Sequence, residues 1–178
     1  SYQSKSSGYE FMFYDADKIK ETTFMFGSGV ASMEFPNEDI AIKYSDRDIN
    51  QTGQQSSFIG HIWAVYPLPE ERYLLGNHYA QFLVWDIRQN QFKELDSCGV
   101  EIPTPIFPNQ FIYKIICSSK DEHYWAVGSS GCYRISKDLC ITDFYAADNI
   151  LDELHQLPVN DLRDIYEDQE EILWLASN

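Results

Sequence analysis

The side chains that could hold a metal ion are scattered along this 178-residue chain. Asp15-Ala16-Asp17 resembles the start of a calcium loop, but the residues after it lack the glycine and the closing acidic ligand of such a loop. The histidines show no metal-ligand spacing such as H-E-x-x-H, and we read them as isolated surface or loop residues: His61, His78, His123 and His155. We therefore expect no metal site, and we place Asp15 to Asp17 in a hairpin turn.

No group of residues points to catalysis or to a cofactor. The chain has no glycine loop for phosphate, no G-x-S-x-G turn and no cysteine with a partner placed to activate it. The acidic pairs Glu70-Glu71 and Glu170-Glu171 fall where hairpin turns are expected, so water solvates them. A glycosidase would need two carboxyl groups facing each other across a cleft. We expect no catalytic residue and no cofactor, and an enzyme acting on glycans stays as a third interpretation.

The cysteines leave the redox compartment open. Cys98, Cys117, Cys132 and Cys140 allow three complete pairings and lack the close pairs of a structural zinc site. Most of them lie in strand-like runs, where a cysteine usually packs as a small buried apolar residue. We expect them to be free and buried.

The elements that would position a site come from a unit of about fifty residues that recurs almost four times. In each copy an aromatic residue is followed by apolar residues and then by a small residue. The aromatic residues are Phe24, Tyr73, Trp125 and Trp174. An apolar run precedes each of them, over Phe11 to Tyr14, Ile62 to Tyr66, Ile112 to Cys117 and Leu162 to Tyr166. The copies span about 9–58, 59–108, 109–157 and an incomplete 158–178, and each opens with a hairpin.

Each complete copy continues with two further strand-like pieces, which turn residues separate. Four short strands in a unit of about forty to fifty residues are typical of a β-propeller blade. Helical repeats would need apolar residues at three- and four-residue spacing, whereas these runs are short and rich in β-branched and aromatic residues. We predict an all-β fold of about three and a half four-stranded antiparallel blades, a partial β-propeller. An antiparallel sandwich is the alternative, and the one helix candidate, 149–157, ends at Pro158.

Charge and repeat number limit the partners. With 13 Lys plus Arg against 28 Asp plus Glu, the formal net charge is -15, which disfavours nucleic acid and anionic membranes. No apolar run approaches the roughly twenty residues that a membrane-spanning helix needs. An incomplete array of blades leaves an open flank at each end. We therefore expect a piece of a larger propeller, or a homodimer of two copies that pair their open blade edges.

The last copy resembles a known repeat. It reads Leu157-Pro158-Val159-Asn160-Asp161, then an apolar strand and an acidic turn, then Leu173-Trp174-Leu175-Ala176-Ser177. It resembles the two-component regulator propeller repeat, in which a leucine-proline-x-asparagine-aspartate segment precedes an apolar strand and a leucine-tryptophan pair. The match is strongest in this fourth copy, partial in the third and second, and weak in the first.

The resemblance implies the extracytoplasmic, periplasmic sensor region of a hybrid two-component receptor that joins a histidine kinase to a response regulator. Such receptors, especially in gut bacteria, sense breakdown products of complex glycans. The resemblance therefore implies an oligosaccharide ligand, partners in the remaining blades and domains of the receptor, and a kinase outside this chain. The alternative is a non-sensing propeller that serves as a protein-interaction scaffold.

The repeat yields two sets of candidate residues. We assign a structural role to the recurring aromatics, which would pack between sheets, and to the loop-shaping glycines Gly27, Gly76 and Gly128. Sugar stacking is the alternative role of Trp125 and Trp174. In a propeller, the loops between second and third strands emerge around the central channel, where ligand sites gather. The ligand-binding candidates there are Asn77, His78, Tyr79, Ser129 and Ser130.

Overall fold

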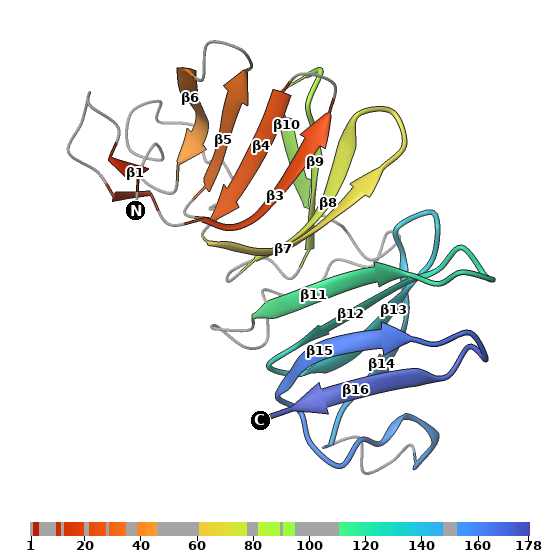
Figure 1. The fold of residues 1–178 in the computed structure, drawn as a ribbon. Coiled ribbons are helices and arrows are strands. Elements are labelled where there is room, and N and C mark those ends of the chain that lie inside the picture. The colour runs from red at the N-terminus through yellow and green to blue at the C-terminus, as the bar shows by residue number, and fades with distance from the viewer. Residues whose placement is uncertain are drawn as a thin grey trace.

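The computed structural model of the chain consists of small antiparallel sheets that follow one another along the sequence (Figure 1). It describes residues 2–3, 10–11, 13–19, 22–27, 29–34, 39–45, 61–77, 82–89, 91–94, 111–147 and 153–178. Within these residues, no helix is long and apolar enough to cross a membrane.

Three of the sheets have four strands, and each strand pairs with the next one along the chain. Blade one is β3 (Phe13–Ile19), β4 (Thr22–Gly27), β5 (Gly29–Glu34) and β6 (Asp39–Ser45). Blade two is β7 (Ile62–Leu68), β8 (Arg72–Asn77), β9 (Phe82–Asp86) and β10 (Gln91–Glu94). Blade three is β11 (Ile112–Cys117), β12 (Tyr124–Gly128), β13 (Gly131–Ile135) and β14 (Ile141–Tyr145). Blade four is the two-stranded sheet β15 (Leu162–Glu167) and β16 (Leu173–Ser177), and a short sheet of β1 (Tyr2–Gln3) and β2 (Glu10–Phe11) precedes blade one.

The prediction of an all-β fold built from propeller blades is confirmed. The first strands of successive blades, β3, β7, β11 and β15, contact one another, as the inner strands of a propeller do. The remaining strands of each sheet lead outward from them (Figure 1).

One local prediction is wrong, and the helix candidate amounts to a single turn in its described part. Asp15 to Asp17, expected in a hairpin turn, lie inside β3, because this strand continues to Ile19 before the chain turns. The helix candidate 149–157 contains, in its described part, a single 3-10 turn, η2 (Glu153–His155). The chain leaves that turn at once, because Gln156 forms a parallel bridge with Ala146 of blade three.

A β-bulge recurs at the same point of the first hairpin in every blade. The pairing register shifts between Phe13 and Asp15, Ile62 and Ala64, Ile112 and Lys114, and Leu162 and Asp164. A bulge inserts one extra residue and increases the local twist of the strand. Because it has the same place in each blade, it aligns the four copies residue by residue.

This alignment changes which residue of blade two corresponds to the recurring aromatic of the other blades. Counted from the bulge, the residue that corresponds to Phe24, Trp125 and Trp174 is Leu74 and not Tyr73. Side chains alternate between the two faces of a strand, so a slip of one residue moves a side chain to the other face. Tyr73 accordingly packs against the preceding blade, where Phe24 lies.

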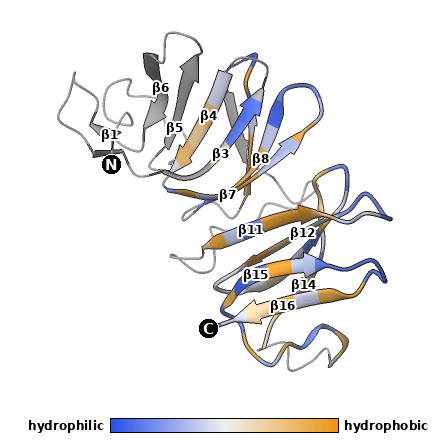
Figure 2. Ribbon diagram, viewed as in Figure 1, coloured by the Kyte–Doolittle hydropathy of each residue, from blue (hydrophilic) through white to orange (hydrophobic). Residues whose placement is uncertain are grey.

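The apolar core lies between successive sheets. Blades one and two enclose Trp85, which is 1% exposed and meets the Phe24 ring edge-on at a centroid distance of 5.2 Å. Two further clusters lie between blades two and three and between blades three and four. Figure 2 shows the apolar residues concentrated on the strands and the polar residues at the turns. Each large side chain buried in this way stabilises the fold by roughly 1.5–3 kcal/mol.

Two of the repeat glycines allow close packing. A Cβ atom on Gly76 would lie 2.5 Å from Cγ2 of Ile112 in blade three, and one on Gly128 would collide with the carbonyl oxygen of Phe111. Among the described glycines, positive φ occurs at Gly131, with a φ of 136°, in the turn between β12 and β13. The predicted loop-shaping conformation therefore belongs to Gly131, and Gly76 is needed for contact between blades.

Candidate functional site

The predicted ligand residues are only partly described. Asn77, the last residue of β8, is fully buried. His78 and Tyr79 lie outside the described residues. A ligand site at this loop therefore stays a prediction.

The two serines of the turn between β12 and β13 are engaged in hydrogen bonds within the fold. The Oγ of Ser129 accepts a hydrogen bond from the Phe111 N–H at 2.9 Å, and the Ser129 N–H donates to the Phe111 carbonyl at 2.9 Å. The Ser130 Oγ lies 2.8 Å from the Tyr133 hydroxyl, close enough for a hydrogen bond. A ligand there would compete with these internal bonds.

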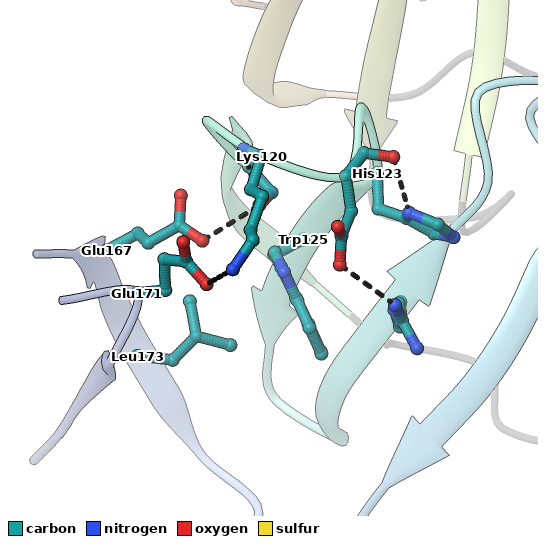
Figure 3. A pocket seen from close by; sticks show the side chains of 9 residues that line it. Lys120, His123, Trp125, Glu167, Glu171 and Leu173 are labelled. Atoms are coloured by element: carbon teal, nitrogen blue, oxygen red, sulfur yellow. Dashed lines mark hydrogen bonds and ion pairs between the residues drawn. The ribbon is translucent and has the colours of Figure 1, made fainter. Parts of the chain in front are cut away.

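A pocket of about 110 Å³ lies at the other end of the strands, between blades three and four (Figure 3). The β11–β12 and β15–β16 turns meet there. Blade three lines the pocket with Ser118, Lys120, Asp121, His123, Trp125 and Arg134, and blade four lines it with Glu167, Glu171 and Leu173.

Trp125 and Leu173 form the apolar wall of the pocket. Trp125 lies opposite Ile116 and Arg134 on the neighbouring strands, and its side chain faces blade four, where Leu173 belongs to the same cluster. The guanidinium carbon of Arg134 lies 5.6 Å from the centre of the indole ring, within the range of a cation–π contact. The wall therefore combines an aromatic surface with a nearby cation.

Glu167 ties blade four to the turn of blade three. Its Oε1 accepts a hydrogen bond from the Ser118 hydroxyl at 2.8 Å, and its Oε2 accepts one from the Ser119 N–H at 2.8 Å. Both bonds favour the charged form and lower the pKa of Glu167, with the Ser119 backbone bond as the main cause. Glu167 is thus a carboxylate whose two oxygens are both engaged.

Lys120 and Glu171 form a second contact between the two turns. The Nζ of Lys120 lies 2.7 Å from Oε2 of Glu171, and both side chains are largely exposed. The hydrogen bond to Glu171 raises the pKa of Lys120, which keeps the ammonium charged. Exposed ion pairs contribute little to stability, so a polar ligand can replace either partner at low cost.

Arg134 has unused hydrogen-bonding capacity. Its nearest carboxylates, Asp121 and Asp143, lie 3.7 Å and 3.6 Å away, which is longer than a hydrogen bond. Its buried Nε has no hydrogen-bond partner among the described residues. The two Nη atoms, whose carboxylate contacts are long, can donate to a ligand oxygen.

The three described cysteines are in different states. Cys132 is buried, and its burial raises the pKa of the thiol to about 12. Cys117 is also free, as expected, but Cys140 is disulfide-bonded, which corrects the expectation of free cysteines. Cys98 lies outside the described residues. Those residues also include no cluster of ligands that could hold a metal ion.

The sequence pointed to Trp125 but not to its polar neighbours. Glu171 was expected in a solvated hairpin turn and His123 was expected to be isolated, whereas no prediction singled out Lys120 or Glu167. His123 instead lines the pocket, with its Nδ1 2.8 Å from the Asp121 carbonyl oxygen. The available signal was the charge contrast between a lysine turn in the third repeat and an acidic turn in the fourth.

Comparison with known proteins finds solved structures with a similar fold. No family model and no curated protein matches the chain. The extracellular domain of the hybrid two-component system BT3049 from B. thetaiotaomicron has a TM-score of 0.64 and 11% identity, and the match covers 93% of this chain and 19% of that one. The extracellular domain of the one-component system BT4673 from the same organism has a TM-score of 0.57 and 11% identity, and the match covers 99% of this chain and 27% of that one.

A third similar structure has another role. PorZ of Porphyromonas gingivalis, a surface component of the type-IX secretion system, has a TM-score of 0.61 and 12% identity, with coverage of 93% of this chain and 25% of PorZ. The chain thus spans a quarter or so of these proteins. At such low identity, the likeness is one of fold.

Proposed function

We propose that the chain is part of the extracytoplasmic sensor region of a hybrid two-component receptor. In this proposal it binds a glycan-derived ligand in the pocket between blades three and four, and a kinase outside the chain receives the signal. The observation that carries the proposal is the pocket, where two sheets meet and which offers an indole ring and the guanidinium of Arg134, whose carboxylate contacts are longer than hydrogen bonds. The chain itself would bind and would not catalyse.

The pocket suits a sugar ring. A pyranose has an apolar C–H face that can pack on Trp125, and its hydroxyl groups both donate and accept hydrogen bonds. Arg134 and Lys120 can donate to it, and the Glu171 carboxylate can accept. Because the lining holds the carboxylates of Asp121, Glu167 and Glu171 beside only two permanent cations, a neutral polyol is favoured over an anion.

Signalling requires that the ligand prefer one arrangement of the blades. A ligand that binds two arrangements equally shifts nothing, however tightly it binds. Blades three and four meet at this pocket through exposed contacts, which rearrange at low cost. A ligand that bridges Trp125 and Glu171 would therefore favour the arrangement in which both are in reach.

Two observations support a periplasmic location. Cys140 is disulfide-bonded, and disulfides persist mainly in oxidising compartments. BT3049 and BT4673, whose folds are similar, are described as extracellular domains.

Isothermal titration calorimetry with a panel of oligosaccharides tests the ligand site. We expect saturable binding of at least one of them, which Trp125→Leu weakens by about tenfold or more. Trp174→Leu is the matched control, because Trp174 has the same position in blade four but lines no part of this pocket. Lys120→Gln, at an exposed side chain, is a second test that spares the core. No binding across the panel, or equal weakening by both tryptophan variants, would refute the site.

A protein-interaction scaffold is the second candidate function. Blade four and the segment before it leave large apolar side chains exposed, namely Leu154, Tyr166 and Trp174. The similarity in fold to PorZ, a component of a secretion system, suits such a role. A tight protein partner, together with no response to any saccharide, would favour the scaffold.

A further inference from the structure

The pocket between blades three and four is small for a saccharide site. Its volume of about 110 Å³ compares with about 150 Å³ for a protein cavity that binds one benzene molecule, and with about 300–1,000 Å³ for the sites of drug-sized ligands. A chain of two or more linked sugar rings therefore exceeds the pocket. Most of such a molecule would have to lie outside it.

The carboxylate of Glu167 closes one border of the pocket. Its two oxygens accept hydrogen bonds from the Ser118 hydroxyl and the Ser119 N–H, both at 2.8 Å, and so join the turn of blade three to blade four. Ser118 is buried, and hydrogen bonds to a charged group are about twice as strong as those between neutral groups. The hairpins β11–β12 and β15–β16, which carry these residues, are described in full. A ligand that extended past Glu167 would have to break both bonds.

The pocket opens at the ion pair of Lys120 and Glu171. These side chains are 62% and 42% exposed, and an exposed pair of this kind contributes little to stability, so a ligand can separate it. Trp125 and Leu173, which pack against the buried cluster between the blades, form the apolar wall. Figure 3 shows both charged side chains beside this wall. A sugar that enters here has the wall on one side and solvent on the other.

We propose that the pocket takes the terminal sugar unit of a saccharide and leaves the other units in solvent. The inference rests on the proposed function and specifies which part of a glycan-derived ligand is bound. A unit in the interior of a chain carries a glycosidic bond on both sides and needs two ways out of its site. The bonds of Glu167 and the wall of Trp125 and Leu173 leave one. The site therefore distinguishes chain ends from chain interiors.

A length series measures how much of the saccharide is bound. Calorimetry is carried out with the mono-, di-, tri- and tetrasaccharide of the best ligand in the panel. We expect their dissociation constants to differ by less than about threefold, because each added unit lies in solvent and contributes no contact. A larger gain of affinity with length would overturn the proposal, since it would show that the site contacts several units.

The intact polysaccharide built from the same unit tests whether a chain end is needed. It can compete with the disaccharide only through its few ends, so we expect weak competition at a given mass concentration. Partial cleavage by an endo-acting hydrolase creates ends without changing the mass, and competition should rise in proportion to them. Repeating the competition with Trp125→Leu, and with Trp174→Leu as the control, shows whether it takes place at the pocket. Equal competition before and after cleavage would overturn end recognition.

These outcomes separate the inference from the proposed function. Saccharides that bind through Trp125 but gain affinity with length overturn end recognition and leave the ligand site intact. The same holds if the intact polysaccharide competes as well as its fragments. No binding by any saccharide of the panel overturns both.

Discussion

Glutamates close the first hairpin turns of blades two, three and four in a backbone conformation that suits glycine. Glu71, Glu122 and Glu171 have φ of 58°, 51° and 66°. An L-residue in the left-handed region carries a cost of roughly 1–2 kcal/mol, which glycine avoids. The turns of blades three and four store this strain next to the pocket.

We expect Glu122→Gly to stabilise the fold by up to about 1 kcal/mol, since relief of backbone strain exceeds the entropy that glycine adds to the unfolded chain. The ion pair that is lost, to Lys137 at 3.7 Å, is exposed and weak. Urea unfolding measures the effect. Glu170→Gly, in the same type of turn but without positive φ, is the control and should destabilise. Equal effects of the two changes would refute the role of strain.

A methyl group on Gly76 should separate blades two and three. Its Cβ would lie 2.5 Å from Cγ2 of Ile112, so we expect Gly76→Ala to lower the free energy of unfolding by roughly 1–3 kcal/mol. The loss should shrink when Ile112→Gly removes both clashing atoms, Cγ2 and Cβ at 2.5 Å and 2.6 Å, and a double-mutant cycle measures this coupling. Strict additivity of the two changes would show that the clash is not the cause.

At the scale of the strand, the sequence predicts the blades well and the register of blade two poorly. Tyr73, Leu74 and Leu75 are all large and apolar, so nothing in the pattern says which of them faces which neighbour. The bulge that decides the register has no residue signature of its own. The strand itself is therefore predictable, and its alignment to the other copies needs the pairing seen in the structure.

The polar part of the pocket was also beyond sequence reasoning. Lys120 lies in one hairpin turn and Glu167 and Glu171 border another, about fifty residues later in the chain. Each turn alone reads as a solvated loop. Only the packing of blade four on blade three brings them together, and that packing depends on the bulge and the strand faces.

The hairpin of blade four should loosen in acid before the rest of the chain. The Asp164 carboxylate forms an ion pair with Lys114, and the Glu167 carboxylate accepts hydrogen bonds from Ser118 and Ser119. These interactions lower the pKa of both carboxyl groups. A carboxylate whose pKa is lower in the folded state than in the unfolded state stabilises the fold fully when the pH is above its unfolded-state pKa, which is 4.5 for Glu167. This stabilisation is lost as the pH falls through the pKa of the folded state. Urea unfolding as a function of pH measures the loss.

Glu167→Gln is the control for this pH dependence. The amide keeps the shape of the side chain but cannot ionise, so the variant should lose part of the acid sensitivity while remaining folded. An unchanged slope of stability against pH would show that Glu167 does not link the two blades in this way.

At the scale of the whole molecule, the two faces of blade four differ in their surroundings. Glu167, Glu171 and Leu173 contribute to the pocket beside blade three, and Tyr166 and Trp174 lie on the opposite face. We therefore expect Trp174→Ser to leave the dissociation constant of a bound saccharide unchanged, measured by calorimetry, because Trp174 does not line the pocket. A weaker saccharide complex would show that the far face of blade four also supports the pocket.

The central claim is that one ligand bridges two blades, and amide hydrogen exchange with and without a saturating saccharide tests it most directly. The account predicts that residues 118–123 of blade three and 167–173 of blade four become protected together, while blades one and two are unchanged. Protection of only one of these turns, or protection at the β12–β13 turn instead, would contradict it.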